Sequence, residues 1–129
     1  MRLFIADDSE ILRSRIVEML SEFEEIEIVG QTGYAQEAVE SIIEIIPDVV
    51  ILDLKLPDGN GINVLKKIKK GNSSIKVIIF TNYPYFQYKK KCLEAGAEFF
   101  FYKATEFEKL VEAIKQLIQV CNKDEHWSY

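Results

Sequence analysis

The stretch that decides the fold is Asp48-Val49-Val50-Ile51-Leu52-Asp53-Leu54-Lys55-Leu56-Pro57-Asp58-Gly59. Four consecutive apolar residues, three of them β-branched, lead directly into the carboxylate of Asp53, and a Pro-Asp-Gly turn follows. A strand buried on both faces of a parallel sheet reads as such an unbroken apolar run, whereas a half-buried strand alternates. We therefore predict a central parallel strand with Asp53 at its carboxyl end, where open α/β sheets bind their ligands. An aspartate there either caps the next turn or takes part in chemistry, and the strand alone leaves both open.

On both sides of this stretch, short apolar runs alternate with amphipathic helical patterns. In the helical patterns the apolar residues recur every three or four positions, which indicates one buried face. Five strand–helix units in strict alternation predict an α/β fold, a doubly wound five-stranded parallel sheet with helices on both faces. The expected strands are 2–6, 26–31, 48–53, 75–80 and 98–102, and the expected helices follow Ser9 and span about 35–46, 62–70, 85–95 and 105–122.

The bulk composition is that of one ordinary globular domain. The chain has 129 residues, of which 48% are hydrophobic and 29% charged. The pattern places the domain at residues 1–122 and leaves residues 123–129 as a short C-terminal tail. No run of 18 apolar residues and no signal peptide is present, and two cysteines make no disulfide framework, so we expect a cytoplasmic protein without a membrane segment.

Charge is distributed unevenly along the chain. Residues 1–58 carry 4 basic and 14 acidic side chains, whereas residues 59–129 carry 12 basic and 7 acidic ones, for a net charge of −5. An acidic chain is a poor general nucleic-acid binder, because that affinity rests on neutralising phosphates. The split indicates an acidic site in the first half and a more basic face in the second, although long solvated helices alone could produce it.

All strands of a parallel sheet end at the same edge, so the residues that follow the predicted strands should be neighbours. The first strand is followed by Asp7 and Asp8, the third by Asp53, the fourth by Thr81 and the fifth by Lys103. Three carboxylates, one hydroxyl and one ammonium group are therefore expected around one opening. Each has an ordinary explanation when taken alone, as a helix cap, a turn hydroxyl or a solvated strand end. Their joint placement favours chemistry.

One lysine cannot neutralise three carboxylates. Two like charges about 4 Å apart repel by about 4 kcal/mol at an effective dielectric of about 20, so either a carboxyl pKa rises or a cation binds. Carboxylates in an open cleft suit Mg²⁺, which is commonly shared with a phosphate, and the single histidine, His126, falls in the predicted tail, where it cannot help to bind zinc. With Mg²⁺ bound, a carboxylate is a competent nucleophile toward phosphorus.

This set of residues resembles the receiver domain of two-component response regulators. It comprises Asp7-Asp8, the run Asp53–Gly61, Thr81 and Lys103, all in order, and the resemblance covers about residues 2–121. It implies a flavodoxin-like (βα)5 fold with strand order 2-1-3-4-5. It also implies a phosphorelay signalling module rather than an enzyme, whose only chemistry is Mg²⁺-dependent self-phosphorylation and autodephosphorylation.

The resemblance implies a role for each acidic residue. Asp53 would be the phosphoacceptor, which takes its phosphoryl group from the phosphohistidine of a sensor histidine kinase or a histidine phosphotransfer protein. Asp8, Asp53 and the backbone carbonyl of Lys55 would bind Mg²⁺ directly, and Asp7 would act through a water molecule.

The remaining family positions concern the response to phosphorylation. Lys103 would pair with the acyl phosphate, Thr81 would move to bond it, and Phe100 stands where the family has its switching aromatic residue. Phenylalanine has no hydroxyl, so this switch would work by packing alone. The family usually has proline after the lysine, with a cis bond before it. Here Ala104 follows, and we expect a trans bond because cis would cost about 3–4 kcal/mol.

Two bulky residues should tune how long the phosphoryl group lasts. Lys55 lies two residues after the acceptor and Tyr83 two after the threonine. By family analogy they screen attacking water, which implies a hydrolysis slower than the fastest in the family.

The resemblance also points to partners. The face built from the fourth helix, the last strand and the last helix commonly meets an output protein or a second receiver in a homodimer. Lys89–Lys91 on the fourth helix would suit an acidic partner there, or they are simply a solvated face. The chain is expected to act either as a stand-alone receiver or as the N-terminal part of a transcriptional regulator, and nothing in this segment is expected to contact DNA directly.

Two other classes of protein share parts of this pattern. A phosphohydrolase of the haloacid dehalogenase type also forms an aspartyl-phosphate, but it needs an acid two residues after the nucleophile, where this chain has Lys55. A flavin carrier of the same topology needs a phosphate-binding loop rich in Ser, Thr and Gly after the first strand. Asp7 and Asp8 would repel a phosphate at that position.

Overall fold

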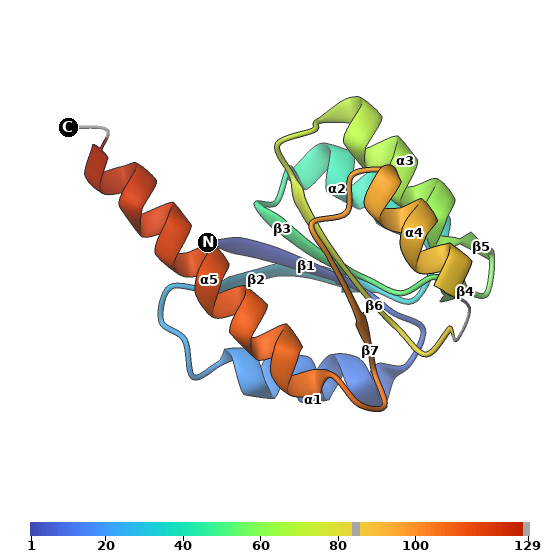
Figure 1. Cartoon of the computed structure of the whole chain (residues 1–129), viewed down its shortest axis with the longest axis horizontal. Helices are drawn as coiled ribbons and strands as arrows, with labels where there is room; N and C mark the ends of the chain where they lie inside the picture. The colour runs from blue at the N-terminus through green and yellow to red at the C-terminus, as the bar shows by residue number, and fades with distance from the viewer. Residues whose placement is uncertain (84–85, 128–129) are drawn as a thin grey trace.

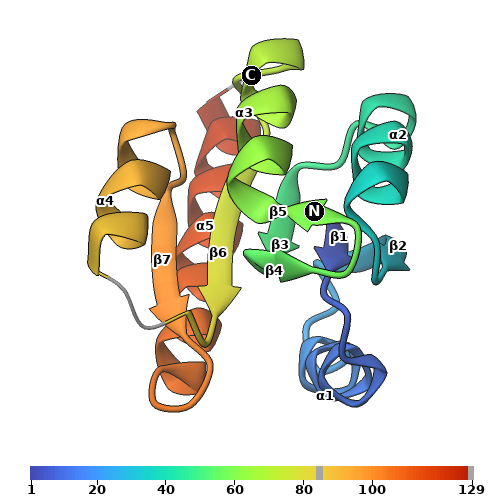
Figure 2. The same cartoon turned by 90° about the vertical axis from the view of Figure 1, so that its right-hand side faces the viewer.

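The computed structural model describes residues 1–83 and 86–127, and among these the side chains up to residue 121. Five parallel strands form one sheet in the order β2-β1-β3-β6-β7 (Figures 1 and 2). Counted as sheet strands this is the order 2-1-3-4-5, so the predicted topology is confirmed. The strands are β1 (Arg2–Ala6), β2 (Glu27–Thr32), β3 (Val49–Leu52), β6 (Lys76–Thr81) and β7 (Phe99–Tyr102), and the helices are α1 (Glu10–Leu20), α2 (Ala35–Ile45), α3 (Gly61–Gly71), α4 (Phe86–Glu94) and α5 (Phe107–Trp127).

The helices cover both faces of the sheet. Helices α1 and α5 lie on one face, and α2, α3 and α4 lie on the other (Figure 1). Each face has its own apolar core, because alternate side chains of a strand point to opposite sides. All four residues of β3 are at most 2% exposed, as expected for a central strand buried on both faces.

The strand register brings the functional edge together. In the central three strands Ala6 pairs with Leu52, and Leu52 pairs with Ile79. The backbone pairing continues one residue further, since the amide of Asp53 donates to the carbonyl of Ala6 at 2.9 Å. Asp7, after β1, and Asp53, after β3, therefore start from the same level of the sheet, and Thr81, the last residue of β6, lies one residue further along.

A small hairpin between β3 and α3 was not predicted. Strands β4 (Lys55–Leu56) and β5 (Gly59–Asn60) pair antiparallel, with Lys55 opposite Asn60 and Leu56 opposite Gly59. The sequence indicates only a loop here, because two residues per strand are too few to show a period of two. The hairpin lies between the β3 strand end and the N-termini of α2 and α3 (Figure 2).

The last helix differs from its predicted range at both ends. It begins at Phe107: residues 103–105 form a turn, and the carbonyl of Glu106 accepts the amide of Leu110 at 3.1 Å. It continues to Trp127, past residue 122, so most of the predicted tail is helical. The apolar stripe ends at Cys121, but the Lys, Asp and Glu residues that follow can extend a helix without burial.

Three further expectations bear on these elements. The predicted start of the fourth helix at residue 85 lies outside the described residues, and α4 is described from Phe86. Cys92 is buried and Cys121 half-buried, and both are free thiols. Among the described residues, no helix combines the length and apolar character needed to span a membrane.

Candidate functional site

The loop after β1 presents two aspartates to the carboxyl edge. Asp7 is 2% exposed, and its Oδ1 accepts the amide of Ser9 at 2.8 Å. Ser9 is the N-cap of α1, and its hydroxyl accepts the amide of Leu12 at 3.2 Å. Because Ser9 caps the helix, neither Asp7 nor Asp8 is needed for that purpose. Asp8 is exposed, and its carboxylate accepts no hydrogen bond from the described residues.

Asp53 lies at the centre of the site, at the end of β3. It is 5% exposed, and both of its carboxylate oxygens are engaged. Oδ1 accepts the hydroxyl of Thr81 at 2.7 Å and, more weakly, the amide of Lys55 at 3.4 Å. Oδ2 accepts the ammonium group of Lys103 at 2.8 Å. The Asp53 side chain therefore faces the ends of β6 and β7 rather than serving only the turn that follows it.

Lys103 joins two of the carboxylates. Its Nζ lies 2.6 Å from Asp7 Oδ2 and 2.8 Å from Asp53 Oδ2, and its side chain is 13% exposed. Burial lowers the pKa of Lys103, but the hydrogen bonds and charges of Asp53 and Asp7 outweigh burial and raise it. Burial also raises the pKa of Asp7 above its ordinary value of 3.8, despite the opposing hydrogen bonds from Lys103 and Ser9. One lysine thus leaves the site with an excess of negative charge.

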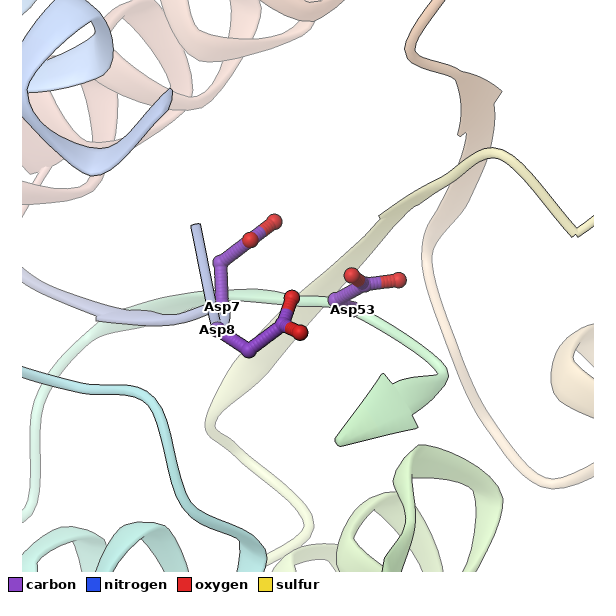
Figure 3. A group of neighbouring side chains, drawn as sticks. All are labelled: Asp7, Asp8 and Asp53. Atoms are coloured by element: carbon purple, nitrogen blue, oxygen red, sulfur yellow. The ribbon is translucent and has the colours of Figure 1, made fainter. Parts of the chain in front are cut away.

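The three aspartates can hold a cation. Asp7, Asp8 and Asp53 each offer one oxygen, and these oxygens all lie within 4.8 Å of one another. Figure 3 shows the carboxylate of Asp8 directed toward Asp53, across the gap between the ends of β1 and β3. Hard oxygen donors in an open site suit Mg²⁺, and Asp8 has both oxygens available for it.

The site opens into a surface depression of about 440 Å³. Lys55 and Tyr83, the two bulky residues expected to screen water, both line it. The ring of Tyr83 packs edge-on against Tyr88, with 4.6 Å between the ring centroids. The depression is lined by Asp8, Asp53, Lys55, Thr81, Asn82, Tyr83 and Lys103.

Thr81 and Phe100, the two residues expected to act as a switch, occupy inward positions. The Thr81 hydroxyl already bonds the Asp53 carboxylate, and Thr81 is 1% exposed. Phe100 is 4% exposed, and its ring meets that of Tyr102 edge-on at 5.4 Å. The Lys103–Ala104 peptide bond is trans, as expected. The amide of Ala104 donates to Asn82 Oδ1 at 3.1 Å, which ties the loop after β7 to the loop after β6.

The contacts by which Arg13 and Gly61 support the site were not predicted from the sequence. The guanidinium of Arg13 donates to the carbonyl of Asp7 at 2.5 Å and to Gln31 at 3.1 Å, so it fixes the loop that carries the aspartates. Gly61 donates to the carbonyl of Leu54 at 2.8 Å and lies against the Asp53 backbone. Arg13 reads as a polar position of an amphipathic helix, so no local pattern could indicate its role. For Gly61 a signal was available, because two glycines close together in one loop, Gly59 and Gly61, indicate a close approach of the backbone to another segment.

The lysine run lies away from these carboxylates, on α4. Lys90 and Lys91 are exposed and Lys89 is half-buried. Lys91 also lies over the ring of Tyr88, with Nζ 5.6 Å from the ring centroid. Hydrogen bonds from Lys109 and the Tyr102 amide lower the pKa of Glu106, and the charge of Lys89 adds to this effect, so this lysine acts on the loop before α5.

Comparison with known protein families gives one match over most of the chain. The model described as Response regulator receiver domain matches residues 3–115. A relative in Bacillus subtilis, the uncharacterized transcriptional regulatory protein YvfU, is 32% identical over 118 residues, which are 92% of this chain and 59% of that protein. The chain therefore spans little more than half the length of this relative.

Solved structures show the same fold. A LuxR-family DNA-binding response regulator from Staphylococcus aureus is 33% identical, with a TM-score of 0.82 over 91% of this chain and 98% of that one. A CheY-like response regulator receiver domain protein from Methanospirillum hungatei is 28% identical, with a TM-score of 0.84 over 95% of this chain and 97% of that one.

Proposed function

The chain belongs to the response regulator receiver domain family, and on that premise we propose that Asp53 is its phosphoacceptor. The family is a two-component signalling module rather than a catalytic enzyme, so the chemistry to be explained is transfer onto the protein itself. One observation carries the proposal. The buried carboxylate of Asp53 contacts both Thr81 and Lys103, and it lies beside two further aspartates.

The contacts of Asp53 suit the formation of an acyl phosphate. A carboxylate oxygen attacks the phosphorus of the donor, a P–O bond to Asp53 forms, and the bond between phosphorus and the leaving group breaks. The leaving group is the imidazole of a histidine kinase or of a histidine phosphotransfer protein, or the carboxylate of acetyl phosphate. Lys103 and Thr81 already donate to opposite oxygens of Asp53, so they stand ready to stabilise charge on the product.

Mg²⁺ fits the donor set of this site. Asp8, Asp53 and the backbone carbonyl of Lys55 would hold the ion directly, and it would supply positive charge to the transferring oxygens. Both oxygens of Asp7 are already engaged, by Ser9 and by Lys103. That engagement supports a role for Asp7 through a water molecule rather than as a direct ligand.

Mg²⁺ is expected to stabilise the folded chain through Asp8. A ligand that binds only the folded state adds about 2.7 kcal/mol at a concentration of about 100 times Kd. Thermal unfolding at increasing Mg²⁺ measures this gain. Asp8→Asn removes the unengaged carboxylate and should abolish most of the shift, whereas Glu37→Gln on the exposed part of α2 should keep it. An equal shift in the Asp8→Asn variant would contradict the assignment.

Lys55 and Tyr83 are expected to slow the loss of the phosphoryl group. Both line the depression above Asp53, where an attacking water must enter. Lys55→Asn and Tyr83→Asn should each speed dephosphorylation several-fold, followed as release of inorganic phosphate from the purified phosphoprotein. Lys90→Asn, on the exposed face of α4, is the control and should leave the decay unchanged. If both site variants lose phosphate at the rate of the parent, Lys55 and Tyr83 do not screen Asp53 from water.

Thr81 and Phe100 are proposed to couple phosphorylation to the surface of α4, β7 and α5. Phe100 lacks a hydroxyl and is buried, so the coupling would act through its packing. The partner would be an output protein or a second receiver, with Lys89–Lys91 available to an acidic surface. The receiver unit itself is proposed to be residues 1–122. Because this chain spans only part of a transcriptional regulatory relative, a regulator of transcription is the proposed whole protein.

Incubation with acetyl phosphate and Mg²⁺ tests the proposed function. A single phosphoryl group should be gained, as seen by intact mass, and the gain should require Mg²⁺. Turnover of phosphate esters without a protein adduct would instead favour a phosphohydrolase.

A further inference from the structure

The N-terminus of α2 is capped by a residue from a different part of the chain. Its N-cap residue, Tyr34, has no side-chain oxygen positioned to accept from the first turn, and makes no such bond. The carboxylate of Asp58 fills this place, with Oδ1 2.6 Å from the amide of Ala35 and Oδ2 3.1 Å from the amide of Gln36. These two backbone hydrogen bonds lower the pKa of Asp58. The carboxylate is therefore charged at neutral pH and suits the positive end of the helix dipole.

Asp58 stands at the turn of the hairpin formed by β4 and β5. This hairpin has two residues per strand, and such a short antiparallel pair has little stability of its own. The next residue, Gly59, also packs closely on α2, since a Cβ at that position would lie 3.1 Å from the Cβ of Ala35. The turn of the hairpin is thus held against α2 by two hydrogen bonds and by the close approach of Gly59 to the side chain of Ala35.

The other strand of the hairpin is tied to α3. Asn60 is the N-cap of α3, and its Oδ1 accepts the amide of Ile62 at 2.7 Å. Lys55 pairs with Asn60 across the hairpin. The backbone of Lys55 therefore belongs to a hairpin that is bonded to the N-termini of both α2 and α3 (Figure 2). Lys55 comes two residues after Asp53 and lines the same depression.

We propose that Asp58 is a positioning residue for the metal site, which it serves by fixing the hairpin that carries the Lys55 carbonyl. The inference rests on the proposed function, because it needs that carbonyl to be a Mg²⁺ ligand. Asp58 itself is exposed and belongs to no part of the carboxylate cluster. Its effect reaches the metal through the backbone of residues 55–60. Outer partners that orient metal ligands typically change metal affinity by about 10–100-fold when they are removed.

Mg²⁺ titration of the full chain, followed through backbone amide shifts by NMR, tests the inference. Asp58→Ala should raise the Kd for Mg²⁺ about tenfold, the lower end of the range for such partners. Asp58→Asn keeps one acceptor oxygen and should raise the Kd less than Asp58→Ala does. Because Asp58 is exposed, both variants should keep dispersed spectra.

A matched control separates positioning from a loss of helix stability. Ile42 is fully buried in the C-terminal half of α2, two turns away from the amides that Asp58 caps, so Ile42→Val weakens packing of the same helix without removing the cap. Its Kd for Mg²⁺ should equal that of the parent.

An unchanged Kd in Asp58→Ala, or an equal rise in Ile42→Val, would overturn the positioning role while the metal site stands. If the parent chain shows no Mg²⁺-dependent shifts at Asp8 and Asp53, the proposed metal site fails, and the inference fails with it.

Discussion

Replacing Lys103 by methionine is expected to lower the free energy of unfolding by about 3 kcal/mol and to slow phosphoryl transfer to Asp53 strongly. Removing one partner of a buried ion pair costs about 3–5 kcal/mol, because the charge that remains is uncompensated. The two carboxylates that Lys103 contacts, Asp7 and Asp53, are 2% and 5% exposed. The lower end of the range applies because Asp7, whose pKa is already raised, can take up a proton. Chemical denaturation at pH 7 without metal measures the loss.

The loss of stability in the Lys103→Met variant should depend on pH. The hydrogen bond and charge of Lys103 lower the pKa of Asp7, so their removal raises a pKa that burial already holds above 3.8. A carboxyl with a raised pKa binds more protons in the folded than in the unfolded chain, and this favours folding as pH falls. The difference in stability from the parent should therefore be largest near pH 7 and shrink as pH falls through the raised pKa.

Lys69 offers the matched control for this experiment. Its ammonium lies 2.9 Å from Glu98, and its side chain is 12% exposed, so its burial resembles that of Lys103. Lys69→Met should also lower the stability, but it lies at the opposite edge of the sheet and should leave phosphorylation of Asp53 unchanged. Equal slowing of phosphorylation in both variants would show that the Lys103 effect is only structural. If the free energy of unfolding of Lys103→Met equals that of the parent, the ion-pair account is contradicted.

The second large effect is expected at Gly61. A Cβ there would overlap the carbonyl oxygen of Asp53 and lie 2.7 Å from the Cα of Leu54. These atoms are backbone and cannot turn aside as a flexible side chain can. Overpacking typically costs about 1–3 kcal/mol, and we expect Gly61→Ala to cost about 3 kcal/mol. Because the displaced backbone carries Asp53, phosphorylation should slow as well, even though the new methyl group touches no reacting atom.

Gly71, at the other end of α3, is the control for Gly61. A Cβ on Gly71 would have no heavy atom within 4 Å. Gly71→Ala should therefore be neutral, or stabilise by up to about 1 kcal/mol through the entropy of the unfolded chain. Similar denaturation midpoints for Gly61→Ala and Gly71→Ala would refute the close approach of the hairpin loop to α3.

The sequence predicts the elements of this fold well where their patterns are long or unmixed. The run Val49–Leu52 identifies a strand buried on both faces, and the alternation of strands with helices then requires a parallel sheet. The strand ends follow from that topology, and so do the neighbours of Asp53. The strand order 2-1-3-4-5 came from resemblance, because alternation alone permits other orders.

What sequence could not predict are contacts between distant segments. Asp58 reads as part of a Pro-Asp-Gly turn, yet its carboxylate caps α2, 23 residues earlier. Arg13 reads as a solvated helix position, yet it bonds the carbonyl of Asp7. Both depend on which loops meet at the sheet edge, and neither leaves a periodic or local signature. The end of α5 was misjudged for a different reason, since a helix can continue after its buried stripe has ended.

The most direct test of the central claim is to locate the phosphoryl group. The protein is phosphorylated with acetyl phosphate and Mg²⁺, the acyl phosphate is trapped by borohydride reduction, which converts the modified aspartate to homoserine, and the peptides are mapped by mass spectrometry. We expect homoserine at position 53 alone, and no adduct in Asp53→Asn, while Asp58→Asn remains a substrate. Homoserine at another aspartate, or an undiminished adduct in Asp53→Asn, would contradict the account.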